Sequence, residues 1–214
     1  INIIKYENDD KITEEFSKIS NARVIWGGDD TVKKIKKIAS PVKCIDISFP
    51  DRYSFSIINL ESLKNLNNID YSNIIKKFYT DNYTFDQNAC NSSHLIVWLG
   101  KKENYNLAKN FWIRLNNYIN TKINYPDSVS TEKYNKICTD LVNYSNIKKL
   151  TKYSKSLHVV TLNKLIKENE FQRGQWGYFY EYSCQDLKIL SQIITEKYQT
   201  LSYHGFDLDF FRKF

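Results

Sequence analysis

The sequence has no methionine, only six glycines and three prolines, and no long apolar run among its 214 residues. A bilayer-spanning helix needs about 18 to 20 consecutive apolar residues, and the N-terminus has no basic flank leading into a small-residue cleavage site. We therefore exclude a membrane span and a secreted precursor and expect a cytoplasmic protein. Low-complexity disorder is excluded too, because apolar and aromatic residues recur along the whole chain.

Methionine is absent even from position 1, where isoleucine stands. Either the chain is an internal piece of a longer polypeptide, or methionines written as modified residues are missing from the sequence. At 214 residues the chain is long enough for one large domain or two small ones, each with a buried core. We expect an internal piece that starts inside a domain.

The four cysteines are far apart. Cys44, Cys90, Cys138 and Cys184 follow one another at intervals of 46, 48 and 46 residues, without a Cys-x-x-Cys pair or a nearby histidine pair. This spacing argues against a structural zinc site. Because the sequence also lacks a secretory signal, a disulfide framework is not expected. We predict no metal site, and we expect Cys44, Cys138 and Cys184 in the core because they lie on apolar faces.

Positive charge is in excess, with 31 lysines and arginines against 24 aspartates and glutamates, which gives a net charge of +7. The densest run is Lys33, Lys34, Lys36 and Lys37, which a helix over residues 31–38 would present to solvent. A solvated face is favoured over an anion-binding patch. The alternative is a non-catalytic binding module for nucleic acid or an acidic partner, whose binding would weaken steeply with salt.

Apolar periodicity predicts strands that alternate with helices. Residues 23–38 predict a short buried strand, a double-glycine turn and a helix capped by Asp29 or Asp30. The run from Ser93 to Leu99 is almost wholly apolar, which predicts a strand covered on both faces. This alternation indicates an α/β fold with a mainly parallel sheet. The other predicted strands are 42–47, 53–59, 157–162, 178–182 and 199–203, and the other helices are 60–77, 104–120, 132–143 and 185–195.

Cys90 is the most informative residue for chemistry. It stands in TFDQNACNSS (residues 84–93), a polar junction between a predicted helix and the buried strand that follows. α/β proteins often place reacting groups at such junctions. Amide and backbone N–H donors there could stabilise both a thiolate and an oxyanion that develops beside it. On local sequence alone an inert, half-buried cysteine is favoured, and His94 is expected to be structural rather than a base.

The segment around Cys90 resembles the nucleophile segment of the aldehyde dehydrogenase superfamily, whose general form is Gly-Gln-x-Cys. Its variant Gln-Asn-Ala-Cys is similar to the LuxC family, the acyl reductases that supply fatty aldehyde to bacterial luciferase. Three further blocks agree in order, and the four together make Cys90 the expected nucleophile. The first of these blocks, VIWGGDDTV (24–32), resembles the cofactor turn of the family. The second, IDISFPDRYSFSII (45–58), stands where the superfamily has Glu-Leu-Gly-Gly-Lys-Ser-Pro. The third, RGQWGYFYEY (173–182) with KYQTLSYHG (197–205), resembles the C-terminal region of LuxC proteins.

The resemblance implies an aldehyde dehydrogenase-like fold, with a three-layer α/β/α catalytic domain and parts of a Rossmann-like cofactor domain. It divides the chain into three segments. Residues 1–44 would be the last βα part of the nicotinamide-cofactor domain, residues 45–182 the catalytic thiol domain, and residues 183–214 a C-terminal return segment. On this division the upstream strands of the nucleotide site are not part of the chain.

The resemblance also implies a reaction. The thiolate of Cys90 would accept a fatty acyl group from CoA or from a partner acyl-protein synthetase, and hydride from NADPH (or NADH) would release the aldehyde. The Cys90 backbone N–H and the Asn88 side chain would hold the thioester oxygen. Gly27, Gly28 and Trp176 are the expected cofactor-binding residues, since a pyrophosphate approaches most closely where the backbone lacks a Cβ. We expect a homo-oligomer without a nucleic acid partner.

Two departures from the superfamily pattern bear on mechanism. The general-base glutamate falls on or beside Phe49, with Asp46 and Asp51 the nearest carboxylates. Hydrolysis of a thioacyl intermediate needs a base to activate water, so its absence favours a reductase over an NAD-dependent oxidising aldehyde dehydrogenase, the remaining alternative. The glutamate that holds the nicotinamide ribose falls on Gly174, so cofactor placement cannot be copied from the dehydrogenases.

Overall fold

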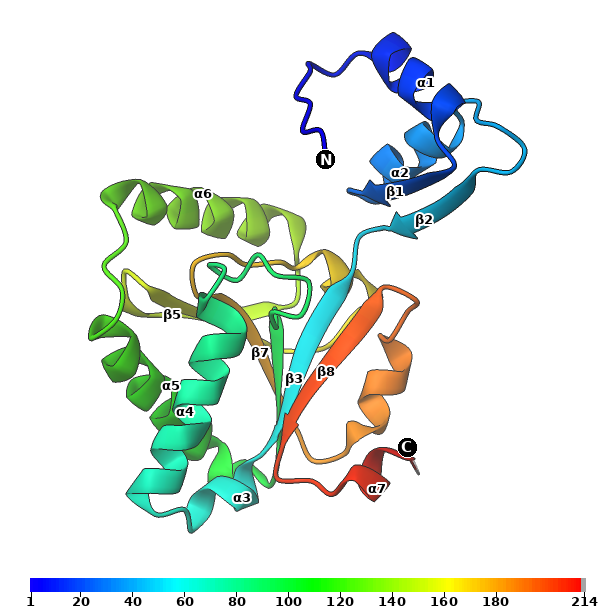
Figure 1. Cartoon of the computed structure of the whole chain (residues 1–214). Helices are drawn as coiled ribbons and strands as arrows, with labels where there is room; N and C mark the ends of the chain where they lie inside the picture. Colours follow the sequence, from blue (N-terminus) through cyan, green and yellow to red (C-terminus); the bar gives the residue numbers. More distant parts are fainter. Residues whose placement is uncertain (213–214) are drawn as a thin grey trace. The chain divides into compact units, whose positions relative to one another are not determined.

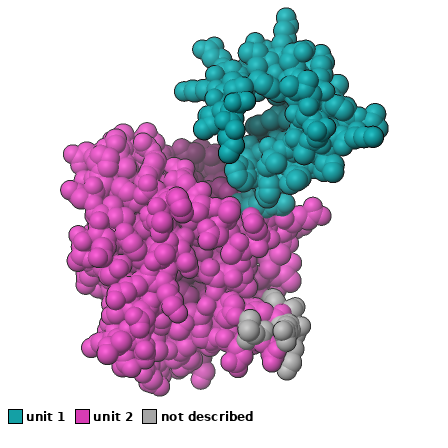
Figure 2. All heavy atoms as spheres, viewed as in Figure 1, with its two compact units in different colours: residues 1–52 teal, residues 53–214 magenta. Residues whose placement is uncertain are grey.

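The computed structural model describes residues 1–212 and divides the chain into two compact units (Figures 1 and 2). Unit 1 comprises residues 1–52, and unit 2 begins at Tyr53. Residues 213–214, the end of the predicted return segment, lie outside the described residues. Within residues 1–212, no helix has both the length and the apolar character that a membrane crossing requires.

Unit 1 is a two-stranded parallel sheet with two helices. Gly28 is the N-cap of the second helix, and the predicted caps Asp29 and Asp30 lie in its first turn. The second strand pairs with the first, so residues 45–49 belong to unit 1, whereas the boundary predicted after residue 44 assigns them to the catalytic domain. The elements are α1 (Asp10–Ile19), β1 (Ala22–Trp26), α2 (Asp29–Lys36) and β2 (Ile45–Phe49).

An ion pair between Arg23 and Asp46 ties β1 to β2. Arg23 Nε lies 2.7 Å from Asp46 Oδ1, and its NH2 donates to Oδ2 at 2.7 Å. Arg23 NH1 also donates to Ile38 O, just beyond α2, at 2.9 Å. The hydrogen bond from Arg23 lowers the pKa of the Asp46 carboxyl below its usual 3.8. One buried guanidinium therefore joins both strands to the end of the helix.

This ion pair predicts acid sensitivity of unit 1. Because the Asp46 pKa is lower in the folded than in the unfolded state, its stabilisation is present above about pH 4 and is lost as the pH falls through the folded-state value. Hydrogen exchange of β1 amides, corrected for intrinsic rates, should accelerate between pH 5 and pH 3. Asp46→Asn should exchange faster at pH 5 and lose much of this pH dependence. Equal pH dependence in both proteins would show that the pair does not hold unit 1.

Unit 2 is built on a six-stranded sheet in the order β5-β6-β7-β4-β3-β8. All neighbours are parallel except β5 and β6, which form an antiparallel hairpin, so the predicted mainly parallel sheet is confirmed. The elements are β3 (Tyr53–Asn59), α3 (Leu60–Lys64), α4 (Asn68–Tyr83), β4 (Leu95–Leu99), η1 (Lys102–Asn104), α5 (Tyr105–Asn120), α6 (Asp127–Asn143), β5 (Ile147–Ser154), β6 (Leu157–Leu162), η2 (Lys167–Phe171), β7 (Tyr178–Cys184), η3 (Leu187–Gln192), β8 (Tyr198–His204) and α7 (Leu208–Arg212).

Both faces of this sheet are covered, which gives the predicted three layers. Helices α4 and α5 cover one face (Figure 1). There Trp98 of β4 and Phe179 of β7 pack with Trp112 of α5 in a cluster that also includes residues of α4. On the other face the sheet residues pack against Leu190 of η3 and Ile137 of α6. Burying each large side chain contributes about 1.5–3 kcal/mol. The covered faces explain why the strands read as continuous apolar runs.

Four details differ from the sequence prediction. The predicted helix 60–77 is two helices, α3 and α4, because Asn67 caps a new helix with its side chain on Asp70 N at 2.9 Å. The predicted helix 185–195 is the short 3-10 helix η3. Helix α1 and strand β5 were not predicted.

Candidate active site

Cys90 lies in the loop between α4 and β4, at the amino end of the parallel strand β4. Its side chain is exposed, and its carbonyl accepts a hydrogen bond from Ser54 Oγ of β3 at 2.6 Å. Farther along the loop, Ser93 N donates to Asn82 Oδ1 of α4 at 2.7 Å. The loop is thus attached to the preceding helix and to the neighbouring strand, while the thiol faces solvent. Ligands of open α/β sheets usually bind at the carboxyl ends of the strands, so this site uses the opposite edge.

Gln87 joins the Cys90 loop to the loop before β7. Its Nε2 donates to Ser93 O and to Tyr178 O, both at 3.0 Å. Its Oε1 accepts from Gly177 N at 3.1 Å and from Tyr178 N at 3.0 Å. The side chain is 1% exposed, and both amide hydrogens and both oxygen lone pairs are used. We call this set of four hydrogen bonds the Gln87 clamp.

The backbone on both sides of the clamp adopts uncommon conformations. Asp86, Gln87 and Trp176 have positive φ angles of 52°, 65° and 53°, which cost a non-glycine residue on the order of 1 kcal/mol or more. Trp176 N donates to Asp86 O at 2.9 Å, which adds a direct backbone bond between the two loops. Such strain persists where surrounding contacts enforce it and is common at active sites.

Two glycines of the second loop have no room for a side chain. A Cβ on Gly174 would lie 1.6 Å from Tyr178 O. A Cβ on Gly177, whose φ is +79°, would lie 2.1 Å from Ser156 O. The structure therefore gives a physical reason why the superfamily's glutamate is absent at Gly174, because this backbone path excludes any side chain there.

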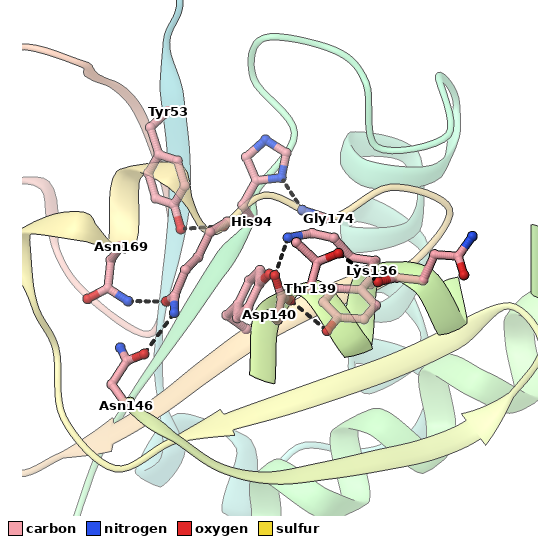
Figure 3. A network of polar contacts seen from close by, with 12 residues as sticks. Tyr53, His94, Lys136, Thr139, Asp140, Asn146, Asn169 and Gly174 are labelled. Carbon is pink, nitrogen blue, oxygen red and sulfur yellow. Dashed lines mark hydrogen bonds and ion pairs between the residues drawn. The ribbon is translucent and has the colours of Figure 1, made fainter. Parts of the chain in front are cut away.

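His94 is a structural residue, as the sequence analysis expected. It is 7% exposed, and its Nδ1 accepts a hydrogen bond from Gly174 N at 3.3 Å (Figure 3). Burial, with a smaller effect of the positive charge of Arg173, lowers the pKa of His94 to about 3. The ring is thus neutral near pH 7, with its proton on Nε2, and it positions the second loop without acting as a base for Cys90.

The other predicted site residues lie in both units. Asn88 is exposed; its Oδ1 accepts from Gln175 Nε2 at 2.7 Å, and its Nδ2 donates to Asp86 O at 3.2 Å. Trp176 is half-buried in the second loop of unit 2. Gly27 and Gly28 lie in unit 1 between β1 and α2, and a Cβ on Gly28 would meet no atom within 4 Å.

A pocket of about 400 Å³ opens beside the second loop. Its wall combines cationic, amide and aromatic side chains from α6 and from the segment before β7. Figure 3 shows Lys136, one of the lining residues, turned toward Asp140, which is fully buried and also accepts a hydrogen bond from Tyr178 OH at 2.8 Å. The lining residues are Glu132, Lys133, Asn135, Lys136, Thr139, Arg173, Gln175, Trp176 and Tyr178.

The two aspartates nearest in the sequence to the position where the resemblance places a general base, Asp46 and Asp51, lie in unit 1. Asp46 is paired with Arg23, and Asp51 N donates to Asp29 Oδ1 at 3.2 Å. Among residues 1–212, no cluster of three or more histidine, cysteine, aspartate or glutamate side chains could hold a metal ion.

The three remaining cysteines differ in burial. Cys184 is buried, as predicted, and burial raises the pKa of its thiol to about 11. The prediction that Cys138 lies in the core is wrong, because it sits on the exposed face of α6. Cys44 is only half-buried.

Sequence reasoning did not assign a role to Gln87, Asn82 or Ser54. Gln87 stands in the Gln-x-x-Cys segment, so its spacing from the thiol was visible. Its clamp was not, because Gly177 and Tyr178 are 90 and 91 residues away in the sequence.

Solved structures with a similar fold include aldehyde dehydrogenases. The NAD-dependent benzaldehyde dehydrogenase from Corynebacterium glutamicum has 9% identity and a TM-score of 0.58, over 94% of this chain and 46% of that chain. A lactaldehyde dehydrogenase has 10% identity and a TM-score of 0.62, over 94% and 45%. A structure from Sinorhizobium meliloti 1021, described as a methylmalonate-semialdehyde dehydrogenase complexed with NAD, has 12% identity and a TM-score of 0.62, over 95% and 45%.

These likenesses show that the fold is that of aldehyde dehydrogenases, of which the chain spans less than half the length. A sequence match is more specific: residues 1–164 match the model of a family described as acyl-CoA reductase (LuxC). No curated protein sequence matches the chain.

Proposed function

The chain belongs to the acyl-CoA reductase (LuxC) family, and on this premise we propose that the full-length protein reduces a fatty acyl thioester to a fatty aldehyde through an acyl group held on Cys90. The observation that carries the proposal is the exposed Cys90 thiol on a loop that the Gln87 clamp fixes. A nucleophile must be accessible to its substrate and held in one orientation, and this loop supports both.

In the proposed reaction the thiolate of Cys90 attacks the carbonyl carbon of the acyl thioester. The donor thiol leaves with the electrons of its C–S bond, and a new thioester forms on Cys90. The Cys90 backbone N–H and the Asn88 amide would stabilise the oxyanion, and Asn88 Nδ2 has a second hydrogen besides the one that it donates to Asp86 O. Hydride addition then gives a thiohemiacetal, which collapses to the aldehyde and the free thiol.

A nicotinamide cofactor, NADPH in this proposal, would supply the hydride. Gly28 is compatible with such a group, because its Cα faces open space at the N-terminus of α2, where backbone N–H groups favour a phosphate. We propose Gly27 and Trp176 as further contacts of the cofactor. Gly174 cannot reproduce the ribose contact of a glutamate, so these residues would hold the cofactor in a way that differs from the dehydrogenases.

The absence of a general base explains why the acyl group on Cys90 would be reduced rather than hydrolysed. Asp46 is paired with Arg23. His94 is a weak base, because its pKa is lowered to about 3, and its unprotonated Nδ1 already accepts a hydrogen bond from Gly174 N. Without a group that activates water, the acyl group would remain on Cys90 until hydride reduces it. We further propose a cytoplasmic homo-oligomer that accepts acyl groups from CoA or from an acyl-protein synthetase.

The proposal predicts a covalent acyl-enzyme. The full-length protein, incubated with labelled long-chain acyl-CoA and without cofactor, should carry one acyl group on the peptide that contains Cys90, found by mass spectrometry and removable by hydroxylamine. Adding NADPH should discharge the label as fatty aldehyde. Label on another residue, or discharge as fatty acid with water alone, would contradict the proposal.

A further inference from the structure

Lys133 of α6 is a buried cation that the proposed reaction does not use. Its side chain is 2% exposed, and its Nζ donates to Lys155 O at 2.8 Å. Within residues 1–212 it forms no salt bridge. A buried ammonium without a carboxylate partner is strongly disfavoured, so its position calls for a reason.

The groups around Lys133 disfavour its protonated form. Lys152 faces it from β5, and the ring of His158 faces it from β6. His158 is 4% exposed, and burial, followed by the effects of Lys133 and Lys152, lowers its pKa to about 4, so the ring is neutral near pH 7. Burial, and to a smaller extent the positive charge of Lys152, lowers the pKa of Lys133 to about 7. The amine is therefore about half protonated at pH 7.

The remaining neighbours do not neutralise this amine. On α6 the adjacent Glu132 is exposed, and Lys136 is paired with Asp140. Arg173 adds a further positive charge from the segment before β7.

Lys133 lines the pocket of about 400 Å³ beside the second loop. Two more cations line the same pocket: Lys136, whose charge is shared with the buried Asp140, and Arg173. Glu132 is the carboxylate of the lining, and it is exposed. Amide donors and the aromatic rings of Trp176 and Tyr178 complete the wall. Several N–H donors of positive charge in one concave site match the oxygens of a phosphoryl group.

We propose that this pocket binds a phosphoryl-bearing anion and that Lys133 takes up a proton from solvent as the anion enters. The neutral amine becomes an ammonium, which the anion then pairs, so no other group changes. The shared chemistry is an organic diphosphate, which either the nicotinamide cofactor or coenzyme A could bring; if the cofactor brings it, the cofactor's diphosphate lies in this pocket and not at Gly28. The inference does not depend on acyl transfer at Cys90, because binding can be measured without turnover.

The test is titration calorimetry of the full-length protein with inorganic pyrophosphate at pH 8, in Tris and in HEPES, which differ in ionisation enthalpy. Because the pKa of Lys133 is lowered to about 7, most of this amine is neutral at pH 8, so binding should take up protons on Lys133. Pyrophosphate is itself partly protonated at this pH and can release a proton on binding. The uptake by Lys133 is therefore measured as the buffer dependence of the enthalpy in the unmodified protein minus that in Lys133→Met. This difference should shrink as the pH is lowered from 8 to 6, where Lys133 already holds its proton.

Variants separate charge from proton uptake. Lys133→Met should weaken pyrophosphate binding about tenfold or more and remove the part of the buffer dependence that Lys133 contributes. Lys133→Arg, which is permanently charged, should still bind but show the same buffer dependence as Lys133→Met. Lys148→Met, which removes an exposed lysine of β5, is the matched control and should change neither quantity.

Competition identifies the source of the diphosphate. Displacement of pyrophosphate by NADPH but not by coenzyme A would assign the pocket to the cofactor, and the reverse would assign it to the acyl donor. Absence of pyrophosphate binding between pH 6 and pH 9, or binding that is equal in Lys133→Met, would overturn the inference. Cys90→Ser should bind pyrophosphate normally, so loss of acylation and loss of anion binding remain distinguishable.

Discussion

Replacing Cys90 with serine is expected to lower aldehyde formation by the full-length protein by about 10⁴-fold or more and to abolish acyl labelling of this peptide. A serine hydroxyl has a far higher pKa than a thiol and needs a neighbouring base to become a nucleophile. His94, the nearest histidine in the sequence, accepts a hydrogen bond from Gly174 N and is buried, so it cannot serve. The measurements are the steady-state rate of aldehyde release and the acyl occupancy by mass spectrometry.

The matched control is Cys138→Ser, because Cys138 is also an exposed free cysteine of unit 2. It should keep both the rate and the labelling within about twofold, since surface substitutions rarely disturb a distant site. If Cys138→Ser lost the label while Cys90→Ser kept it, the nucleophile would have been assigned to the wrong thiol. If both variants kept it, acyl transfer would not use a cysteine of this chain.

Much of the fold could be predicted from apolar pattern. Strand β4 was visible as an unbroken apolar run, and α5 as apolar residues at helical spacing. Both are central elements whose side chains are buried on one or both faces, and burial is what produces such a pattern. The parallel sheet followed from their alternation.

Elements with little burial could not be predicted in the same way. Strand β5 is an edge strand rich in lysine, with an exposed outer part, and among the strands of residues 1–212 it pairs with β6 alone. Helix α1 has a single buried residue, Ser17. In both cases pairing or capping decides the structure, and these interactions leave a weaker trace in the sequence than a buried face does.

The same distinction applies to the candidate site. Cys90 could be predicted because a short segment carries its chemistry and its resemblance. Gln87 lies in that segment, yet its role depends on backbone groups of the loop before β7. The glycine at position 174 was visible as a departure, but its cause is a carbonyl four residues later whose position only the fold defines. Long-range backbone hydrogen bonds of this kind carry no local signature.

Replacing Gln87 with leucine is expected to lower the free energy of unfolding of unit 2 by about 2–5 kcal/mol. Leucine has a similar volume but leaves Ser93 O, Gly177 N and both backbone groups of Tyr178 without the bonds that the amide provides. Each unsatisfied buried group costs about 1–3 kcal/mol, and part of this is recovered by rearrangement. Urea unfolding of the variant and of the unmodified protein measures the difference.

The same substitution should slow acylation of Cys90 by about 100-fold, because the loop that carries the thiol loses its side-chain hydrogen bonds to Gly177 and Tyr178 at the start of β7. Single-turnover labelling, at a temperature where the variant remains folded, separates this effect from the loss of stability. Gln175→Leu is the matched control: it removes an exposed glutamine of the second loop with a single hydrogen bond, to Asn88. It should change the free energy of unfolding by less than about 0.5 kcal/mol. If Gln87→Leu were as stable as Gln175→Leu and acylated Cys90 as fast as the unmodified protein, the clamp would not be what orients Cys90. The strained backbone at Asp86 and Trp176 would then be maintained by the direct hydrogen bond between them.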